Sequence, residues 1–211
     1  MKAVRYHSYG DSDVLVYEDA DRPVAGPGQV VVKVAGAAFN PADAGIRGGY
    51  LQQVFPVAFP HIPGYDLSGV ITEVGDGVSG WSAGDAVVAF LPIGVDGAAA
   101  EYAAAPAETL AAAPRTIELA DAAALPSTGL TAWQALFDQS TIPGPVTARD
   151  GVRTVQVFVR SDAAELAGLV ARVDAGDLKI YVAQRRPLAD LAAVHHEADA
   201  GRLSGKTILT P

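Results

Sequence analysis

Residues 61–90 read HIPGYDLSGVITEVGDGVSGWSAGDAVVAF, and this stretch decides the fold class. Leu67–Val74 and Ala86–Leu91 are apolar runs rich in β-branched residues, which favour extended strands. The connection between them, residues 75–85, contains too many glycines to form a helix. Two strands joined by a local turn are therefore expected here.

The residues before this stretch continue the β pattern. Lys2–His7, Val14–Asp19 and Gln29–Val34 are short β-type runs separated by Gly, Pro and Asp. One short helix is expected at Asn40–Gly48, because Asn40 is a good N-cap and the following proline occupies the first helical position. Many short strands with local turns predict a small barrel.

The period changes after residue 118, where apolar residues begin to recur at helical spacing. Arg153–Arg160 returns to a strand pattern. Ser161–Asp174 is the clearest helix, with Ser161 as the expected N-cap and a single apolar stripe. The remaining expected elements are a strand at Lys179–Ala183, a helix at Leu188–Ala200 and a strand at Lys206–Leu209.

Three glycines, Gly75, Gly77 and Gly80, match the dinucleotide-binding pattern G-x-G-x-x-G. That motif works only where a strand feeds a helix whose N-terminus receives the pyrophosphate. Here WSAGD follows Gly80, and no long helix can begin there. We interpret the glycines as part of a turn between two strands. No other segment supplies the alternating strands and helices of a nucleotide-binding half-sheet.

Composition excludes several classes of function. The net charge of −9 repels a phosphate backbone, so no nucleic-acid partner is expected. The chain has no cysteine, which excludes disulfides, thiol nucleophiles and thiolate zinc sites. The N-terminus lacks a signal-type apolar core, and no apolar run is long enough to span a bilayer. A cytoplasmic protein without membrane contact is expected.

In chain order, several segments resemble the medium-chain dehydrogenase/reductase family, specifically its zinc-free quinone oxidoreductase group. Residues 1–50 are similar to the N-terminal GroES-like barrel, and 61–90 to the next hallmark of the family. LPSTGLTAWQAL, residues 125–136, resembles the stretch that leads to the family's cofactor domain, and residues 162–211 resemble its closing segment. The resemblance implies an α+β fold, a GroES-like β-barrel with C-terminal helices packed on it.

The resemblance breaks between TAWQALFDQ (131–139) and STIPGPVTARD (140–150), where the family holds most of a Rossmann domain. The two flanks meet almost directly in this chain, whereas an independent domain needs roughly 100 residues or more. We therefore expect four parts. They are 1–138, a GroES-like barrel and the following helix; 139–150, a junction loop where the nucleotide domain is missing; 151–176, a leftover strand and helix of that domain; and 177–211, a segment that returns to the barrel.

Three catalytic residues follow from the resemblance. It implies that Asn40, Arg47 and Tyr50 line the cleft for substrate and nicotinamide, where each offers a hydrogen-bond donor. Asn40 is needed as a helix cap in either case, and Arg47 is alternatively a solvated helix residue. Thr128 lies where the family approaches its cofactor and is the candidate vestigial cofactor-binding residue, although both it and Thr131 could simply begin a helix.

Other polar residues receive structural interpretations. Asp43 is expected to be a first-turn carboxylate facing the helix dipole rather than a base. No metal site is expected. Asp66 is a poor candidate ligand, and the adjacent His195 and His196 point about 100° apart on a helix, where they are expected to be partly exposed. Ser127 and His61 show no spacing that implies a catalytic triad.

The leading hypothesis is a catalytic domain of an NADPH-dependent reductase that lacks its cofactor domain and independent redox activity. No cofactor is expected to bind tightly; NADPH belongs to the intact family, and a small carbonyl or quinone compound is the expected ligand class. One alternative is a cofactor-independent isomerase, cyclase or lyase with a perturbed titratable pair in the cleft. Another is a reductase that acts with a partner chain. The strand Arg153–Arg160 would leave an open apolar edge, which predicts a homodimer through it.

Overall fold

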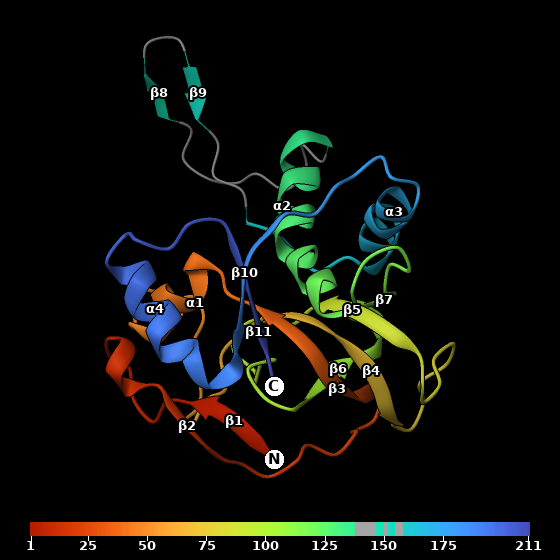
Figure 1. The fold of residues 1–211 in the computed structure, drawn as a ribbon, viewed down its shortest axis with the longest axis horizontal. Helices are drawn as coiled ribbons and strands as arrows, with labels where there is room; N and C mark the ends of the chain where they lie inside the picture. The colour runs from red at the N-terminus through yellow and green to blue at the C-terminus, as the bar shows by residue number, and fades with distance from the viewer. Residues whose placement is uncertain (138–146, 150–151, 155–157) are drawn as a thin grey trace.

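The computed structural model describes residues 1–137, 147–149, 152–154 and 158–211. It is a mixed α+β fold, as expected, with strands and a few helices that cover them (Figure 1). The strands are β1 (Lys2–Arg5), β2 (Val16–Asp19), β3 (Gln29–Ala38), β4 (Asp66–Val74), β5 (Ala86–Phe90), β6 (Tyr102–Pro106), β7 (Leu110–Ala112), β8 (Thr147–Arg149), β9 (Val152–Thr154), β10 (Val182–Pro187) and β11 (Lys206–Thr210). The α-helices are α1 (Pro41–Arg47), α2 (Pro126–Phe137), α3 (Ala163–Asp174) and α4 (Leu191–Asp199).

The main sheet has the strand order β10-β11-β3-β4-β5-β7, and β6 also pairs with β3. All of its pairs are antiparallel except β10 with β11, which are parallel. In the part of the chain that is described, β10 and β7 at the two ends of this order do not pair, so the expected barrel is not closed. The physical reason lies at β11, which meets only Ala37 and Ala38 at the end of β3 and extends the sheet from that corner.

Residues 66–90 form the predicted hairpin of β4 and β5. β4 and β5 are antiparallel, with Asp66 opposite Phe90. Gly77 and Gly80 lie between them with φ of 78° and 82°, which glycine adopts without strain. A hairpin connection therefore accounts for the glycine motif, and no helix follows it, as predicted.

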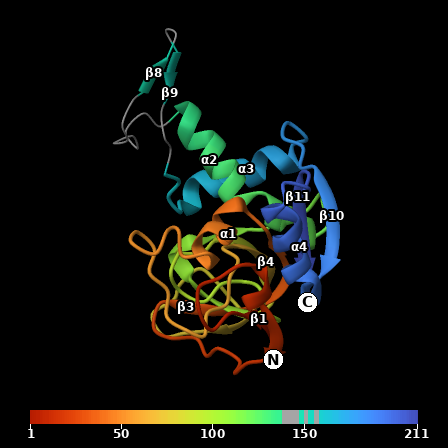
Figure 2. The same ribbon diagram turned by 90° about the vertical axis from the view of Figure 1, so that its left-hand side faces the viewer.

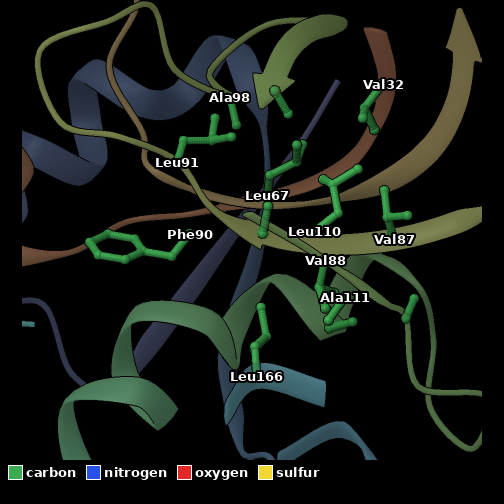
Figure 3. Packing of buried hydrophobic residues seen from close by; sticks show 14 of the residues in the cluster. Val32, Leu67, Val87, Val88, Phe90, Leu91, Ala98, Leu110, Ala111 and Leu166 are labelled. Atoms are coloured by element: carbon green, nitrogen blue, oxygen red, sulfur yellow. The ribbon is translucent and has the colours of Figure 1, made fainter. Parts of the chain in front are cut away.

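The largest buried cluster joins residues of the sheet with residues of α2 and α3, which lie side by side in both ribbon views (Figures 1 and 2). A second cluster lies around β1 and α4. In Figure 3, Leu67, Val87 and Leu110 lie on one face of the sheet. Val88 and Ala111 lie on the other face, toward Leu166 of α3. α3 buries the predicted apolar stripe, which repeats every three to four residues and consists of Leu166, Leu169, Val170 and Val173. Burying such side chains stabilises the fold by about 1.5–3 kcal/mol each.

Three expectations about the C-terminal half need correction. The N-cap of α3 is Asp162 rather than Ser161, since Asp162 Oδ1 accepts the Glu165 N–H at 2.9 Å. The strand expected at Lys179–Ala183 lies at Val182–Pro187, where pairing with β11 fixes its position. The strand expected at Arg153–Arg160 is present only in part: β9 pairs with β8, residues 155–157 lie outside the described residues, and 158–160 are not strand.

Candidate functional site

Asn40 stands where β3 ends and α1 begins. It occupies the N-cap position, as predicted, and the Asp43 N–H donates to its carbonyl oxygen at 2.9 Å. In return the Asp43 Oδ2 accepts the Asn40 N–H at 2.8 Å. These reciprocal bonds satisfy backbone groups that a helix end leaves without partners. Asp43 therefore lies in the first turn of α1, as expected.

The side chain of Asn40 enters a polar cluster built around Asp66, the first residue of β4. Asp66 is fully buried and accepts four hydrogen bonds. They come from Asn40 Nδ2 at 2.9 Å, the Ser127 N–H at 2.7 Å, Ser127 Oγ at 2.7 Å and Lys206 Nζ at 3.1 Å. We call Asn40, Asp66, Ser127 and Lys206 the polar cluster.

Lys206 supplies the only cation in this cluster. Its ammonium also donates to Asn40 Oδ1 at 2.5 Å and to Thr128 Oγ1 at 3.2 Å, and its side chain is 14% exposed. An ammonium beside a buried carboxylate offsets the cost of removing that carboxylate from water. Because all three ammonium protons have acceptors, Lys206 holds Asn40, Asp66 and Thr128 in a fixed arrangement.

Two cavities border α1. One, of about 610 Å³, borders the polar cluster and is lined by Asn40, Thr128, Asp199 and Lys206 among others. The other, of about 860 Å³, is mostly apolar, and its walls include Ala42, Leu51, Phe55, Phe90, Ile93 and Phe158. Cavities of this size and character are typical of sites for small organic ligands.

The other two residues implied for the cleft lie elsewhere. Arg47 is only 3% exposed, and its Nη2 donates to Asp199 Oδ2 of α4 at 2.8 Å, so the alternative of a solvated helix residue is wrong. Tyr50 is 87% exposed. Neither residue lines the two large cavities beside α1. The structure therefore brings Asn40 and Thr128 together but not Arg47 and Tyr50.

Other candidate residues have structural partners. Thr131 Oγ1 donates to the Ser127 carbonyl at 2.6 Å within α2. His61 lies 3.1 Å from the Tyr65 hydroxyl, and its Nδ1 is 3.6 Å from Asp96. Burial lowers the pKa of His61, and the Asp96 carboxylate opposes that shift. His61 and Ser127 have different partners and form no triad.

Two buried groups near α1 titrate far from their ordinary range. Burial raises the pKa of Asp43 to about 7, against the opposing effect of the Asn40 N–H. Burial, with the nearby Arg47 charge, lowers the pKa of His195 to about 3. His195 is fully buried and packs on the Phe39 ring, with ring centroids 4.8 Å apart, so the expectation of a partly exposed histidine is wrong for this residue.

Ser127 and Lys206 are functional candidates that sequence reasoning missed. They lie 61 and 140 residues from Asp66 in the chain, so no local pattern connects them to it. One signal was present: an aspartate at the start of an apolar strand must find partners if it is buried. Sequence alone does not say which residues those partners are.

Metal and nucleotide sites find no support in the described part of the chain. No group of three or more metal-ligating side chains occurs among those residues. Within the same residues, β10 and β11 form the one parallel pair, and the turn after β10 reads PLAD without glycine. A binding site for the diphosphate of NADPH needs a glycine-rich turn between a strand and a helix. The described residues therefore do not fit this cofactor.

In the described residues, no helix has the length and apolar character to cross a membrane.

Comparisons with known proteins agree with this arrangement. Residues 26–115 match the model of the alcohol dehydrogenase GroES-like domain, and residues 95–209 match the model of the zinc-binding dehydrogenase. The chloroplastic quinone-oxidoreductase homolog of Spinacia oleracea is 38% identical over 143 residues, 67% of this chain and 44% of that protein. The chloroplast envelope quinone oxidoreductase homolog of Arabidopsis thaliana is 39% identical over 137 residues, 64% of this chain and 42% of the relative.

The chain thus matches less than half the length of these curated relatives. Because both are chloroplast proteins by name, the cytoplasmic location stays a prediction.

Solved structures share the fold. The quinone oxidoreductase from Coxiella burnetii aligns with a TM-score of 0.84 at 19% identity, over 100% of this chain and 99% of that one. The Escherichia coli quinone oxidoreductase complexed with NADPH aligns with a TM-score of 0.81 at 17% identity, over 100% of both chains. The chain therefore belongs to the medium-chain dehydrogenase/reductase family, in its zinc-free, quinone oxidoreductase-type branch.

Proposed function

We propose that this chain is the catalytic, GroES-like part of an NADPH-dependent quinone oxidoreductase-type reductase that lacks its cofactor domain, and that it has no independent redox activity. One observation carries the proposal. The polar cluster around Asp66 is fully formed beside a ligand-sized cavity of about 610 Å³, while the described residues contain no half-sheet for a nucleotide. The four parts given by the sequence, 1–138, 139–150, 151–176 and 177–211, are retained in the proposal as its domain boundaries.

The expected ligand class is a small carbonyl or quinone compound. The cavity of about 860 Å³ offers apolar walls for a flat ring, including Phe55 and Phe90. In the cavity of about 610 Å³, Thr128 Oγ1 accepts a hydrogen bond from the Lys206 ammonium, so its own hydroxyl proton is available to donate to the carbonyl oxygen of a ligand bound there. In the intact family NADPH supplies the hydride. No hydride-transfer step is assigned to this chain alone, because its described residues do not seat that cofactor.

The test is a titration of the purified chain with NADPH, followed by nucleotide fluorescence. We expect no saturable binding up to millimolar nucleotide. Saturable binding in the micromolar range would overturn the proposal. A parallel titration with a water-soluble naphthoquinone, followed by tryptophan fluorescence, tests whether the chain retains the ligand cavity without the cofactor.

The homodimer and the two alternative functions stay predictions. The edge expected to pair, Arg153–Arg160, includes residues 155–157, which lie outside the described residues. Sedimentation at micromolar concentration tests the dimer. The cofactor-independent alternative requires a perturbed titratable pair in the cleft, but its nearby candidates in the sequence, Asp43, Asp66 and His61, line neither large cavity beside α1. Activity that appears only on mixing with a second chain would favour the partner-chain alternative.

A further inference from the structure

Buried polar atoms without partners gather in one region. Eight buried side-chain atoms of the described residues have no hydrogen-bond partner, and seven of them belong to five residues near α1 and α4. These residues are Tyr6, Asp43, Arg47, His195 and Thr207. Folded proteins leave few buried polar groups unsatisfied, and a concentration of them indicates a bound group such as water.

A small cavity lies in this region. It has a volume of about 10 Å³, and both Asp43 and His195 line it. α1 and α4 lie side by side here in both views (Figures 1 and 2). A cavity of this volume is at the lower limit for one water molecule and too small for phosphate or any organic ligand.

The unsatisfied atoms match the hydrogen-bonding capacity of water. Asp43 Oδ1 has no close hydrogen-bond partner, although the Gly64 N–H acts on the carboxyl and Oδ2 accepts the Asn40 N–H. Both ring nitrogens of His195 lack partners, and a neutral imidazole offers one donor and one acceptor. Water carries two donors and two acceptors, so a single molecule can bond to both side chains. Neither residue can turn outward to find solvent, since Asp43 is 2% and His195 0% exposed.

We propose that this cavity is a binding site for one structural water molecule, which bridges Asp43 Oδ1 of α1 to the His195 imidazole of α4. The bridge extends a defined chain of contacts. Asn40 is bonded to Asp43 through its backbone, Asp43 to the water, and the water to α4. The closing segment of the chain thereby helps to fix the position of the helix that follows Asn40. This inference does not depend on the proposed function.

The shifted pKa values of Asp43 and His195 are consistent with the bridge. Burial raises the pKa of Asp43 to about 7 and lowers the pKa of His195 to about 3. Near neutral pH the imidazole is therefore uncharged and the carboxyl is partly protonated. A water molecule satisfies two such groups without separating full charges in the protein interior. Direct pairing of a carboxylate with an imidazolium would instead raise the pKa of the histidine.

The experiment is a crystal structure of the wild-type chain near pH 7, at a resolution that shows ordered water. We expect a density peak within hydrogen-bond distance of both Asp43 Oδ1 and one His195 ring nitrogen. An empty cavity, or a direct hydrogen bond between Asp43 and His195, would overturn the proposal. The wild-type result decides the question without relying on any variant to fold.

Two variants on the same helix sharpen the result. His195→Phe removes one partner of the water, and we expect its occupancy to fall from nearly full to none. His196→Phe changes the exposed neighbour, and the water is expected to remain. If the water keeps full occupancy in His195→Phe, then His195 does not hold it and the bridge is contradicted.

Discussion

Asp43 of α1 and Asp66 of β4 show how differently one fold can bury a carboxyl group. Asp66 accepts four hydrogen bonds, one of them from the Lys206 ammonium. Asp43 is almost as inaccessible to solvent, but only backbone N–H groups, those of Asn40 and more weakly Gly64, face its carboxyl, and Oδ1 has no close partner. The first carboxyl is surrounded by donors, and the second is compensated only in part, which is why its pKa rises to about 7.

The difference teaches which carboxyl organises the candidate site. Removing a carboxylate from water costs several kcal/mol unless charge and hydrogen bonds replace the lost hydration. At Asp66 these replacements come from three other chain segments, so the carboxyl holds Asn40, Ser127 and Lys206 together. At Asp43 no cation contributes a hydrogen bond, and the closest donor is the Asn40 N–H, so the carboxyl mainly fixes the start of α1.

The largest expected effect is that of Lys206→Met. The change leaves Asp66 buried without a cation, and breaking a buried pair in this way costs about 3–5 kcal/mol of unfolding free energy. Urea unfolding at pH 7 measures it. Lys179→Met is the matched control at an exposed lysine and is expected to change stability by less than about 0.5 kcal/mol.

Adding Asp66→Asn to Lys206→Met should recover part of the loss, because the uncompensated charge is removed. Equal costs for the two lysine substitutions would mean that the ammonium does not compensate Asp66, and the contrast between the two aspartates would fail.

His195 gives the next largest effect, and it depends on pH. Its folded pKa of about 3 lies below the unfolded value of about 6.5. Between these values the unfolded chain binds more protons, so stability is present above pH 6.5 and is lost as the pH falls. The loss approaches 1.4 kcal/mol per pH unit, or about 2 kcal/mol from pH 6.5 to 5. Urea unfolding of wild type against His195→Phe at both pH values isolates it.

His196→Phe serves as the control for this comparison because it alters an exposed histidine on the same helix. A wild-type curve that runs parallel to that of His195→Phe at both pH values would contradict the assignment.

Asp43 should show the opposite sign. Its folded pKa of about 7 lies above the unfolded value of about 3.9, so the folded chain binds more protons between them. Its contribution to stability therefore falls as the pH rises from 4 to 7. Asp43→Asn lacks this dependence, and its stability relative to wild type should rise by about 1–2 kcal/mol from pH 5 to 7. Urea unfolding at the two pH values checks the sign, and a relative fall would contradict it.

The sequence predicted the elements around these aspartates well, because their signals are local. The cap at Asn40, the proline after it and the glycine-rich turn between β4 and β5 each act within a few residues. The register of β10 and the N-cap of α3 were off by one to a few residues. The sequence pattern does not separate Ser161 from Asp162 as the N-cap, and the hydrogen bond from the Glu165 N–H decides between them. In the same way, pairing with β11 decides where β10 begins.

The candidate site could be predicted only in part. Asn40 was identified through the family resemblance, but the polar cluster joins residues 40, 66, 127 and 206, and only the folded chain brings them together. Arg47 and His195 were misjudged for the same reason. Each lies on a helix whose local pattern permits exposure, and the packing of α1 against α4 buries both.

The smallest effect we predict tests how far Asp66 depends on any single donor. Ser127→Ala removes the hydroxyl at 2.7 Å but leaves the Ser127 N–H, Asn40 and Lys206 in place. The expected loss is about 1 kcal/mol in urea unfolding. Thr131→Ala, one turn along α2, removes only a bond to the helix backbone and should cost less than about 0.5 kcal/mol. If Ser127→Ala costs as much as Lys206→Met, the stability of the buried carboxylate depends on the hydroxyl rather than on the ammonium.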